Sequence, residues 1–249
     1  MTLDFTLQKY RDLLKSLKDY KIQTVAEYLK TPYQGPLVIL RHDVDRIPKN
    51  ALKIAQIEKE HNIASTYYFR YNGEVFNKNI IQDISKLGHE IGYHYETLSK
   101  TKGDFEEAIK IFQSELNEFR KIAEIKTISM HGSPLSKHVN DEIWKKHSFN
   151  EFNLLGDGSL SISNVSYYTD AGRCWDNQNN IRDYLKLDSK AGKTIRSTDE
   201  LIDLANSHSN SKLYFNIHPE RWTGNIFEWC ISYSKDAVFN IGKRIIRST

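Results

Sequence analysis

The 249-residue chain has few of the features that mark exported, membrane-spanning or nucleic-acid-binding proteins. Its two cysteines, Cys174 and Cys230, have no spacing typical of a metal or redox motif; a thiol-reducing compartment suits them, although one disulfide is also open. No segment approaches the roughly 18 consecutive apolar residues of a membrane span. The net charge is only +3, with both signs mixed along the chain, which argues against nucleic-acid binding.

The first residues also have no apolar core of the kind found in a signal peptide. The segment MTLDFTLQKYRDLLKSLKDYK has the pattern of an amphipathic helix instead. We therefore expect a cytoplasmic protein. Apolar residues make up 39% of the chain, which is enough for a core, and the length is typical of a single α/β domain.

Helical and extended patterns alternate along the chain. Residues 5–30 have helical periodicity and end at the breaker cluster TPYQGP. Strands are predicted at 37–40, 65–71, 89–96, 125–134 and 211–222. Helices are predicted at 48–61, 77–88, 105–122, 198–208 and 226–249, with loops and short strands over 148–180. The alternation predicts a parallel sheet covered by helices, in one domain spanning residues 1–249 with a helical extension at 1–35.

Ionisable residues recur where the predicted strands end. RHDVD follows LVIL, HYE follows HEIGY, MHGSP follows TIS, and IHPERW follows YFN. In a parallel α/β sheet or barrel these ends converge on one face, where such folds place their active sites. We therefore predict one polar site assembled from distant segments.

Two of these residues are carboxylates placed two positions apart. In an extended chain Asp43 and Asp45 point the same way, so their charges lie close together. Two such groups ionise together only if a cation or strong donors compensate. A divalent metal held by one carboxylate, with the other left as a base, resolves this conflict. The alternative interpretation is a helix N-cap and a solvent-facing loop acid.

Histidines end three of the predicted strands. His94 would reach the same sheet edge as Asp45, and imidazole with carboxylate is a typical zinc ligand set. His89 would face the opposite way and is predicted to be structural. His131 and His218 are as compatible with an ordinary polar role as with a ligand role.

These segments together resemble the polysaccharide deacetylase superfamily, also described as NodB homology or carbohydrate esterase family four. GHEIGYHYE is most similar to the family's GHEIGNH segment, and RHDVD resembles its first motif. STYYFRY resembles the next strand, while MHGSP, CWDN and NIHPERW stand where the later motifs lie. The resemblance covers residues 37–222 and looks closest to the branch found among surface-polysaccharide biosynthesis enzymes. It implies an irregular (β/α) barrel of about seven strands.

The resemblance also implies roles for individual residues. Asp43 matches the catalytic base, Asp45 and His94 match metal ligands, and His218 matches a general acid. Asp176 in CWDN matches the carboxylate that orients this acid. The implied metal is most often zinc.

One metal ligand of the family is missing. The second metal histidine normally lies four residues after the first, where this chain has Leu98. His131 is the first candidate to replace it, because it ends a neighbouring strand. Glu96 is the second candidate and His42, which alternates away from the aspartates, is the third.

The arginine of the third motif, which orients the base in the family, is also absent from MHGSP. Arg41, Arg70 and Arg173 are the candidates to replace it, and the sequence does not choose among them. Trp175 and Trp222, together with Arg41, are candidates for lining a sugar-binding cleft. For the two tryptophans, a plain role in the core or rim is the competing interpretation.

The resemblance implies metal-dependent hydrolysis of the N-acetyl group of an amino sugar. A cytoplasmic enzyme would act on a nucleotide-linked or lipid-linked intermediate of surface-polysaccharide synthesis. Two alternatives remain open. One is a metal-dependent hydrolase of another non-peptide C–N bond; the other is a non-catalytic carbohydrate-binding relative that lost its metal because residue 98 is not histidine.

Overall fold

The computed structural model describes residues 3–176, 182, 185, 194–207 and 211–248, with backbone alone for 243–248. The strands are β1 Lys21–Gln23, β2 Leu37–Val44, β3 Thr66–Phe69, β4 Glu90–Tyr95, β5 Ile125–Met130, β6 Gly156–Asp157, β7 Ser166–Thr169 and β8 Lys212–Ile217. The α-helices are α1 Leu7–Ser16, α2 Val25–Lys30, α3 Pro48–Glu60, α4 Lys78–Lys86, α5 Thr97–Lys100, α6 Phe105–Arg120, α7 Thr198–Ser207 and α8 Ile226–Ser248. Short 3₁₀ helices are η1 Asn140–Lys145, η2 Phe149–Phe152 and η3 Pro219–Arg221.

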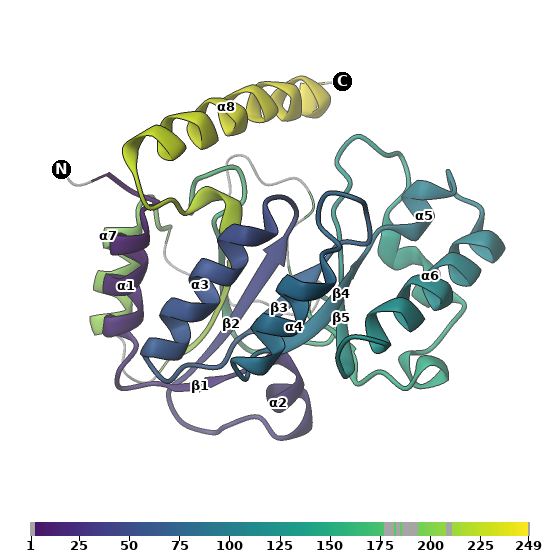
Figure 1. The fold of residues 1–249 in the computed structure, drawn as a ribbon, viewed down its shortest axis with the longest axis horizontal. Helices are drawn as coiled ribbons and strands as arrows, with labels where there is room; N and C mark the ends of the chain where they lie inside the picture. The colour runs from purple at the N-terminus through teal and green to yellow at the C-terminus, as the bar shows by residue number, and fades with distance from the viewer. Residues whose placement is uncertain (1–2, 177–181, 183–184, 186–193, 208–210, 249) are drawn as a thin grey trace.

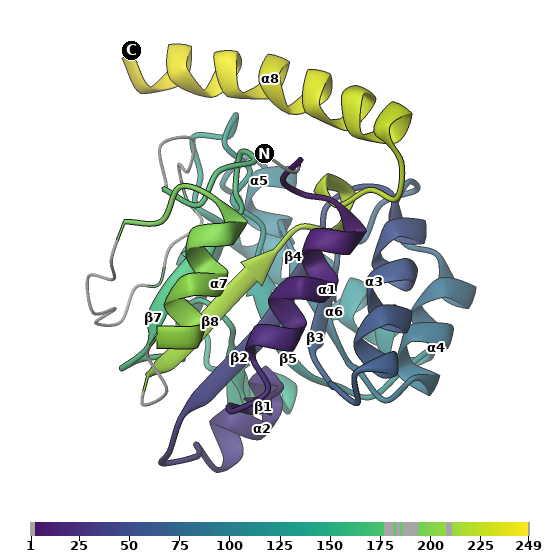
Figure 2. The same ribbon diagram turned by 90° about the vertical axis from the view of Figure 1, so that its left-hand side faces the viewer.

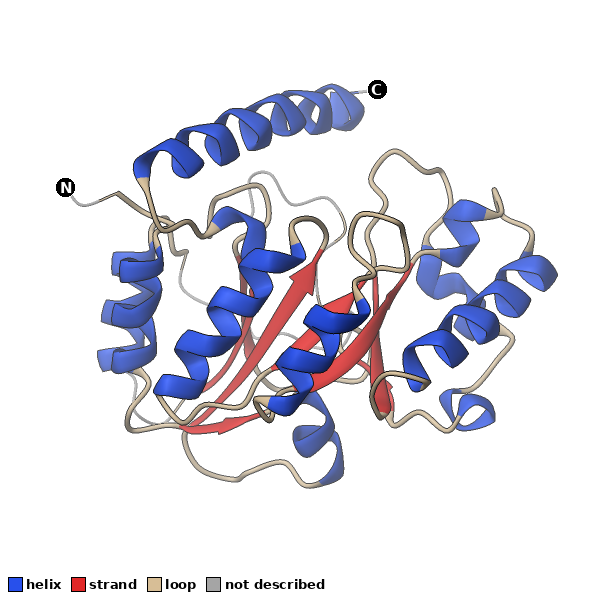
Figure 3. Ribbon diagram, in the orientation of Figure 1, coloured by secondary structure: helices blue, strands red, loops and turns tan. Residues whose placement is uncertain are grey.

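The strands form one curled parallel sheet in the order β6-β5-β4-β3-β2-β8-β7, with β1 paired to the first half of β2. Helices α1, α3, α4 and α6 cover its outer side (Figures 1 and 3). This arrangement confirms the predicted α/β fold with an irregular (β/α) barrel of about seven strands.

Strand β2 is an inner strand of the sheet and lies between β3 and β8. All eight of its residues are buried, as expected for a parallel strand covered on both faces. Its carboxyl end therefore opens at the centre of the barrel rim, with strand ends on both sides.

The predicted helical stretch over residues 5–30 is partly wrong. Residues 21–23 form β1, which joins the sheet beside β2, and they separate α1 from α2. Thr24 begins α2 with a capping box in which its side chain and that of Glu27 satisfy each other's backbone N–H groups. A strand of three residues is too short to interrupt a helical pattern visibly, which explains the error.

Helix α8 crosses above the carboxyl ends of the strands (Figures 1 and 2). Within the described part of the chain, no helix combines the length and apolar character needed to cross a membrane.

A buried carboxylate connects the outer face of β2 to the helices that cover it. Glu58 of α3 accepts hydrogen bonds from the hydroxyls of Tyr10 (2.5 Å), Ser65 (2.6 Å) and Tyr67 (2.6 Å). His42 of β2 places its Nε2 atom 2.7 Å from the same carboxylate. The cluster ties α1, α3, β2 and β3 together.

His42 thus faces away from Asp43 and is removed from the candidate metal ligands. His89 is also buried and structural, as predicted, because its ring lies against the Ala55 carbonyl (3.0 Å) and the Ser65 amide.

Glu58 should make the free energy of unfolding fall in acid. Burial alone would raise its pKa, but the charge and hydrogen bond of His42 lower the pKa from 4.5 to about 2. Because the native pKa lies below the unfolded one, the stabilisation is complete above pH 4.5 and is lost as the pH falls towards 2. The expected loss is on the order of 3 kcal/mol, measured by denaturant titration at each pH.

The matched pair of variants is Glu58→Gln and Glu60→Gln, on the same helix. Glu60 is exposed, so its variant should keep the acid-dependent loss, whereas Glu58→Gln should be less stable at neutral pH and show much less of it. Equal acid dependence in wild type and Glu58→Gln would show that another group is responsible.

Candidate functional site

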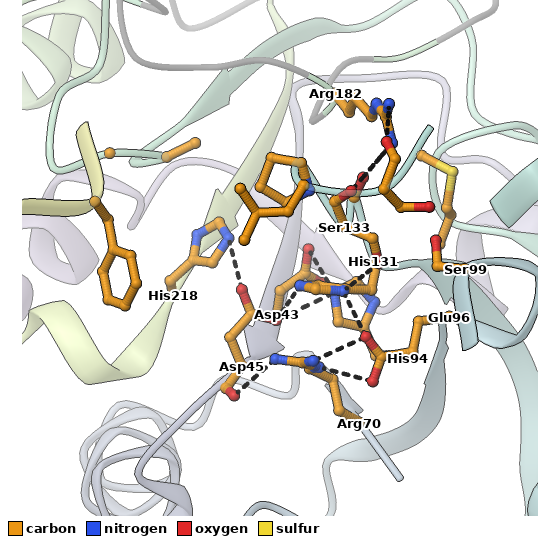
Figure 4. A pocket seen from close by; sticks show the side chains of 18 of the residues that line it. Asp43, Asp45, Arg70, His94, Glu96, Ser99, His131, Ser133, Arg182 and His218 are labelled. Carbon is orange, nitrogen blue, oxygen red and sulfur yellow. Dashed lines mark hydrogen bonds and ion pairs between the residues drawn. The ribbon is translucent and has the colours of Figure 1, made fainter. Parts of the chain in front are cut away.

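A cavity of about 990 Å³ opens at the carboxyl ends of the strands, beneath α8. Its lining includes Asp43, Asp45, His94, His131 and His218, which come from four segments far apart in sequence. Figure 4 shows these side chains gathered at its floor. The predicted convergence of strand ends therefore brings together all five of the main candidates.

Arg41 holds Asp43 in place from the same strand. Its Nε and Nη2 atoms donate to the two oxygens of the Asp43 carboxylate at 2.8 and 2.6 Å, and both side chains are buried. Asn216 of β8 donates a further hydrogen bond of 2.9 Å. Arg41 itself is steadied by Ser159, at 3.0 Å.

Of the three arginines that sequence left open, Arg41 is thus the one that orients Asp43. Arg70 instead pairs with Glu96 (2.8 Å), and Arg173 pairs with Asp236 of α8 (3.3 Å). The assignment of Arg41 as a substrate contact is wrong, because its guanidinium is buried behind Asp43 and does not line the cavity.

Asp43 is ionised because of these neighbours. Burial alone would raise its pKa, but the guanidinium of Arg41, followed by His94 and His218, holds the pKa well below the usual range. The carboxylate therefore stays negative at any ordinary pH.

Asp45 lies between three imidazoles. Its Oδ1 atom is 3.5 Å from Nε2 of His94 and 3.7 Å from Nε2 of His131, and its Oδ2 atom is 4.0 Å from Nε2 of His218. Burial alone would raise its pKa, but the histidines, His131 first, lower the pKa well below its usual range. This carboxylate is the common neighbour of the whole histidine set.

Each histidine is held through its other ring nitrogen. The Nδ1 atom lies 3.0 Å from the Ser129 carbonyl in His94, and 2.9 Å from the Glu96 carboxylate in His131. Such partners fix the tautomer with the proton on Nδ1 and leave Nε2 as a ligand atom, as is usual around metal sites.

The residues fit a divalent metal by their donor chemistry. Asp45 Oδ1 is buried and has no hydrogen-bond partner in the part of the chain that the structure describes. Two ligands of one zinc ion lie roughly 3.4 Å apart, close to the distances from this oxygen to the two imidazoles. No three His, Cys, Asp or Glu side chains among the described residues are already placed to hold an ion. The residues therefore suit a divalent metal by the type of their donor atoms and by the unsatisfied Asp45 oxygen, but they do not form a complete coordination shell.

Glu96, the second candidate for the missing ligand, occupies a supporting position. It pairs with Arg70 and with the Nδ1 side of His131. Burial alone would raise its pKa, but His131 and then Arg70 lower the pKa to about 2. Leu98, at the position of the family's second histidine, is fully buried in α5.

His218 is paired with a carboxylate that sequence did not single out. Its Nδ1 atom lies 2.7 Å from Asp170, which also accepts from the His218 backbone N–H at 3.0 Å. Arg221 and Trp222 donate to the same carboxylate at 3.0 and 2.9 Å. The carboxylate beside His218 Nδ1 is thus Asp170, whereas the resemblance pointed to Asp176.

The two tryptophans belong to the core. Trp175 and Trp222 are almost completely buried, pack against Phe5 and line no part of the cavity. Their prediction as sugar-cleft residues is wrong, and the competing core interpretation holds. Trp222 serves the site only indirectly, by donating to Asp170.

Glu220 is a site residue that sequence reasoning missed. It lines the cavity beside His218, and its Oε2 atom finds no hydrogen-bond partner among the described residues. Burial raises its pKa, while its other oxygen is 3.4 Å from Arg46. Its position two residues after His218 in IHPERW was the available signal.

Comparisons with known proteins find similarity at the level of fold. No family model and no curated protein matches the chain. A Streptococcus mutans CE4 esterase is 14% identical with a TM-score of 0.48; the match covers 90% of this chain and 86% of that one. A Bacillus subtilis peptidoglycan deacetylase mutant is 14% identical with a TM-score of 0.41; the match covers 86% of this chain and 98% of that one.

A third similar structure is a mutant of a CE4 family pseudoenzyme with restored enzymatic activity. It is 13% identical with a TM-score of 0.41; the match covers 83% of this chain but only 62% of the pseudoenzyme's. The roles of individual residues rest on the geometry above.

Metal content tests the ligand set directly. Protein purified without chelator and supplied with zinc should hold about one ion per chain, and His131→Ala should lose most of it, because one of three protein ligands is gone. His138→Ala is the matched control, since His138 lines the same cavity but lies outside the set. Equal zinc in wild type and His131→Ala would remove His131 from the ligands.

Proposed function

We propose that this protein is a metal-dependent deacetylase that hydrolyses the N-acetyl group of an amino sugar, in a precursor of a surface polysaccharide. The observation that carries the proposal is the unsatisfied Asp45 oxygen between His94 and His131. The same cavity contains Asp43, which is paired with Arg41, and His218, which is paired with Asp170.

Asp45, His94 and His131 are the residues that would hold the metal. When bound, a divalent ion at this position would lower the pKa of a water molecule and polarise the amide carbonyl. Glu96 and the Ser129 carbonyl keep the two imidazoles turned with Nε2 toward Asp45.

Asp43 takes a proton from the attacking water in this proposal. The water oxygen forms a bond to the carbonyl carbon, and the C–N bond breaks in the later step. Arg41 and Asn216 fix the direction of the carboxylate, so that the base is already in place when substrate enters. Its permanent negative charge keeps it available as an acceptor.

His218 donates the proton that the departing nitrogen needs. Asp170 holds its Nδ1–H, so the proton to be transferred is carried on Nε2, which faces Asp45 and the cavity. Burial and Arg221 both lower the pKa of His218, but Asp170 and Asp45 outweigh them and raise it above its ordinary value. Acid and base thus have widely separated pKa values, as the two roles require. The products are the free amine and acetate.

The cavity is large enough for a sugar with part of its carrier. Lys102 and Lys137, which are exposed among its lining residues, suit an anionic carrier, such as a nucleotide-linked or lipid-linked pyrophosphate.

Asp43→Asn tests the base. The amide cannot accept the proton, so turnover of N-acetyl sugars should fall by about 100-fold or more. Zinc content should remain at the wild-type level, because Asp43 is not among the proposed ligands. Near-wild-type turnover by Asp43→Asn would show that another residue is the base.

The alkaline limb of the pH–rate profile tests the acid. His218 donates only when protonated, so turnover should fall as the pH rises through its pKa. Asp170 raises this pKa, and Asp170→Asn should therefore move the alkaline limb to lower pH.

Asp176→Asn is the matched control for the acid, because the resemblance pointed to Asp176 while the hydrogen bonds point to Asp170. Its profile should coincide with that of wild type. If the alkaline limb shifted in Asp176→Asn and stayed unchanged in Asp170→Asn, Asp176 would be the carboxylate that orients His218.

A further inference from the structure

The rim of the cavity carries exposed apolar side chains on two different elements. Leu135 lies in the loop after β5 and is 86% exposed; Val238 and Phe239 lie on α8 and are 68% and 57% exposed. All three line the cavity. Large apolar side chains so exposed around an opening are typical of a surface that meets an apolar partner.

The apolar surface continues along the outward face of α8. Phe227, Ile231, Val238 and Ile241 recur at spacings of four, seven and three residues, which places them on one side of a helix. Each is at least 45% exposed. The stripe runs over about four turns of the helix and passes the opening of the cavity.

The opposite face of α8 is fastened to the barrel by polar contacts. Ser232 donates to the Glu220 carbonyl (2.9 Å), and Asn240 donates to the Gly172 carbonyl (2.8 Å). Between them the buried Asp236 carboxylate pairs with Arg46 (2.9 Å) and Arg173 (3.3 Å). These contacts hold the helix with its polar face toward the barrel. The apolar stripe is therefore left exposed, and Val238 within it also borders the cavity.

The charge presented at the rim is positive. Lys102 and Lys137 are exposed cavity-lining residues, and Lys235 is exposed on α8. The acidic lining residues instead face arginine or histidine partners inside the cavity; they are Asp43, Asp45, Glu96, Glu220 and Asp236. Exposed apolar side chains with lysines beside them are the combination that binds an anionic lipid surface.

A second copy of the chain fits these observations less well. A two-fold contact on this surface would bring the rim lysines of the two copies together and would cover both cavities. A bilayer, by contrast, neutralises the lysines and leaves the opening facing the place where a lipid-linked sugar resides.

We infer that the rim residues Leu135, Val238 and Phe239, with the outward stripe of α8, form a docking surface for an anionic membrane. If the proposed function holds, this surface favours the lipid-linked form of the N-acetyl sugar as substrate over the nucleotide-linked form. The lipid chain would remain in the bilayer while the sugar enters between the loop after β5 and α8.

Vesicle flotation tests the docking surface. Wild type should float with vesicles of equal parts phosphatidylglycerol and phosphatidylcholine, and much less with phosphatidylcholine alone. Leu135→Glu and Val238→Glu should each weaken binding to the anionic vesicles about tenfold, because an apolar side chain that would enter the bilayer is replaced by a charge of the lipid's own sign.

Leu155→Glu is the matched control. Leu155 is also an exposed leucine, but it directly precedes β6, and its N–H donates to the carbonyl of Lys126 near the amino end of β5. Its variant should bind as wild type does. Absence of vesicle binding, or equal binding by all three variants, would overturn the proposal. A concentration-dependent dimer that Val238→Glu dissociates, without vesicle binding, would assign the surface to a second copy instead.

The measurement is independent of catalysis, because Asp43→Asn should float as wild type does. Flotation without deacetylation of any N-acetyl sugar would leave the docking surface standing and reject the proposed function. Deacetylation of soluble N-acetyl sugars without flotation would do the reverse.

Discussion

The bidentate pair between Arg41 and Asp43 is the interaction on which the site is built. Both residues belong to β2 and point to the same side, so the strand that carries the carboxylate also carries the cation that fixes it. Burying either charge alone would be strongly unfavourable, and the pair is stable only because the two oxygens are satisfied together. The same strand then delivers Asp45 two residues further on, so one short segment places both carboxylates.

The alternation of β2 gives its two faces different tasks. Asp43 faces the cavity, whereas His42 faces α3 and meets the buried Glu58. The Glu58 cluster fixes the position of β2 against the outer helices, and the inner face can therefore carry an unsatisfied oxygen at Asp45. Neighbouring residues of β2 thus face opposite sides of the sheet, so His42 contributes to stability and Asp43 to the candidate site.

Sequence reasoning predicted that Asp43, Asp45, His94, His131 and His218 would lie together, because strand ends meet on one face of a parallel sheet, and all five line one cavity. It could not locate Asp170, which lies 48 residues before its partner and follows a short strand with no recognisable motif. It misplaced Trp175 and Trp222, because an aromatic residue next to a motif looks the same whether it packs inward or outward. The fold was largely predictable from alternating patterns, apart from the three-residue β1.

The register of β4 and β5 explains how His131 comes to lie beside His94. His94 pairs with Ser129, so the residue two positions after Ser129 lies on the same face, one step nearer the rim. The His131 N–H extends this ladder by donating to the Tyr95 carbonyl at 2.8 Å. The imidazole of His131 thus lies 3.7 Å from Asp45 Oδ1, although the chain has no histidine four residues after His94. Leu98, four residues after His94, is instead fully buried and belongs to the hydrophobic core.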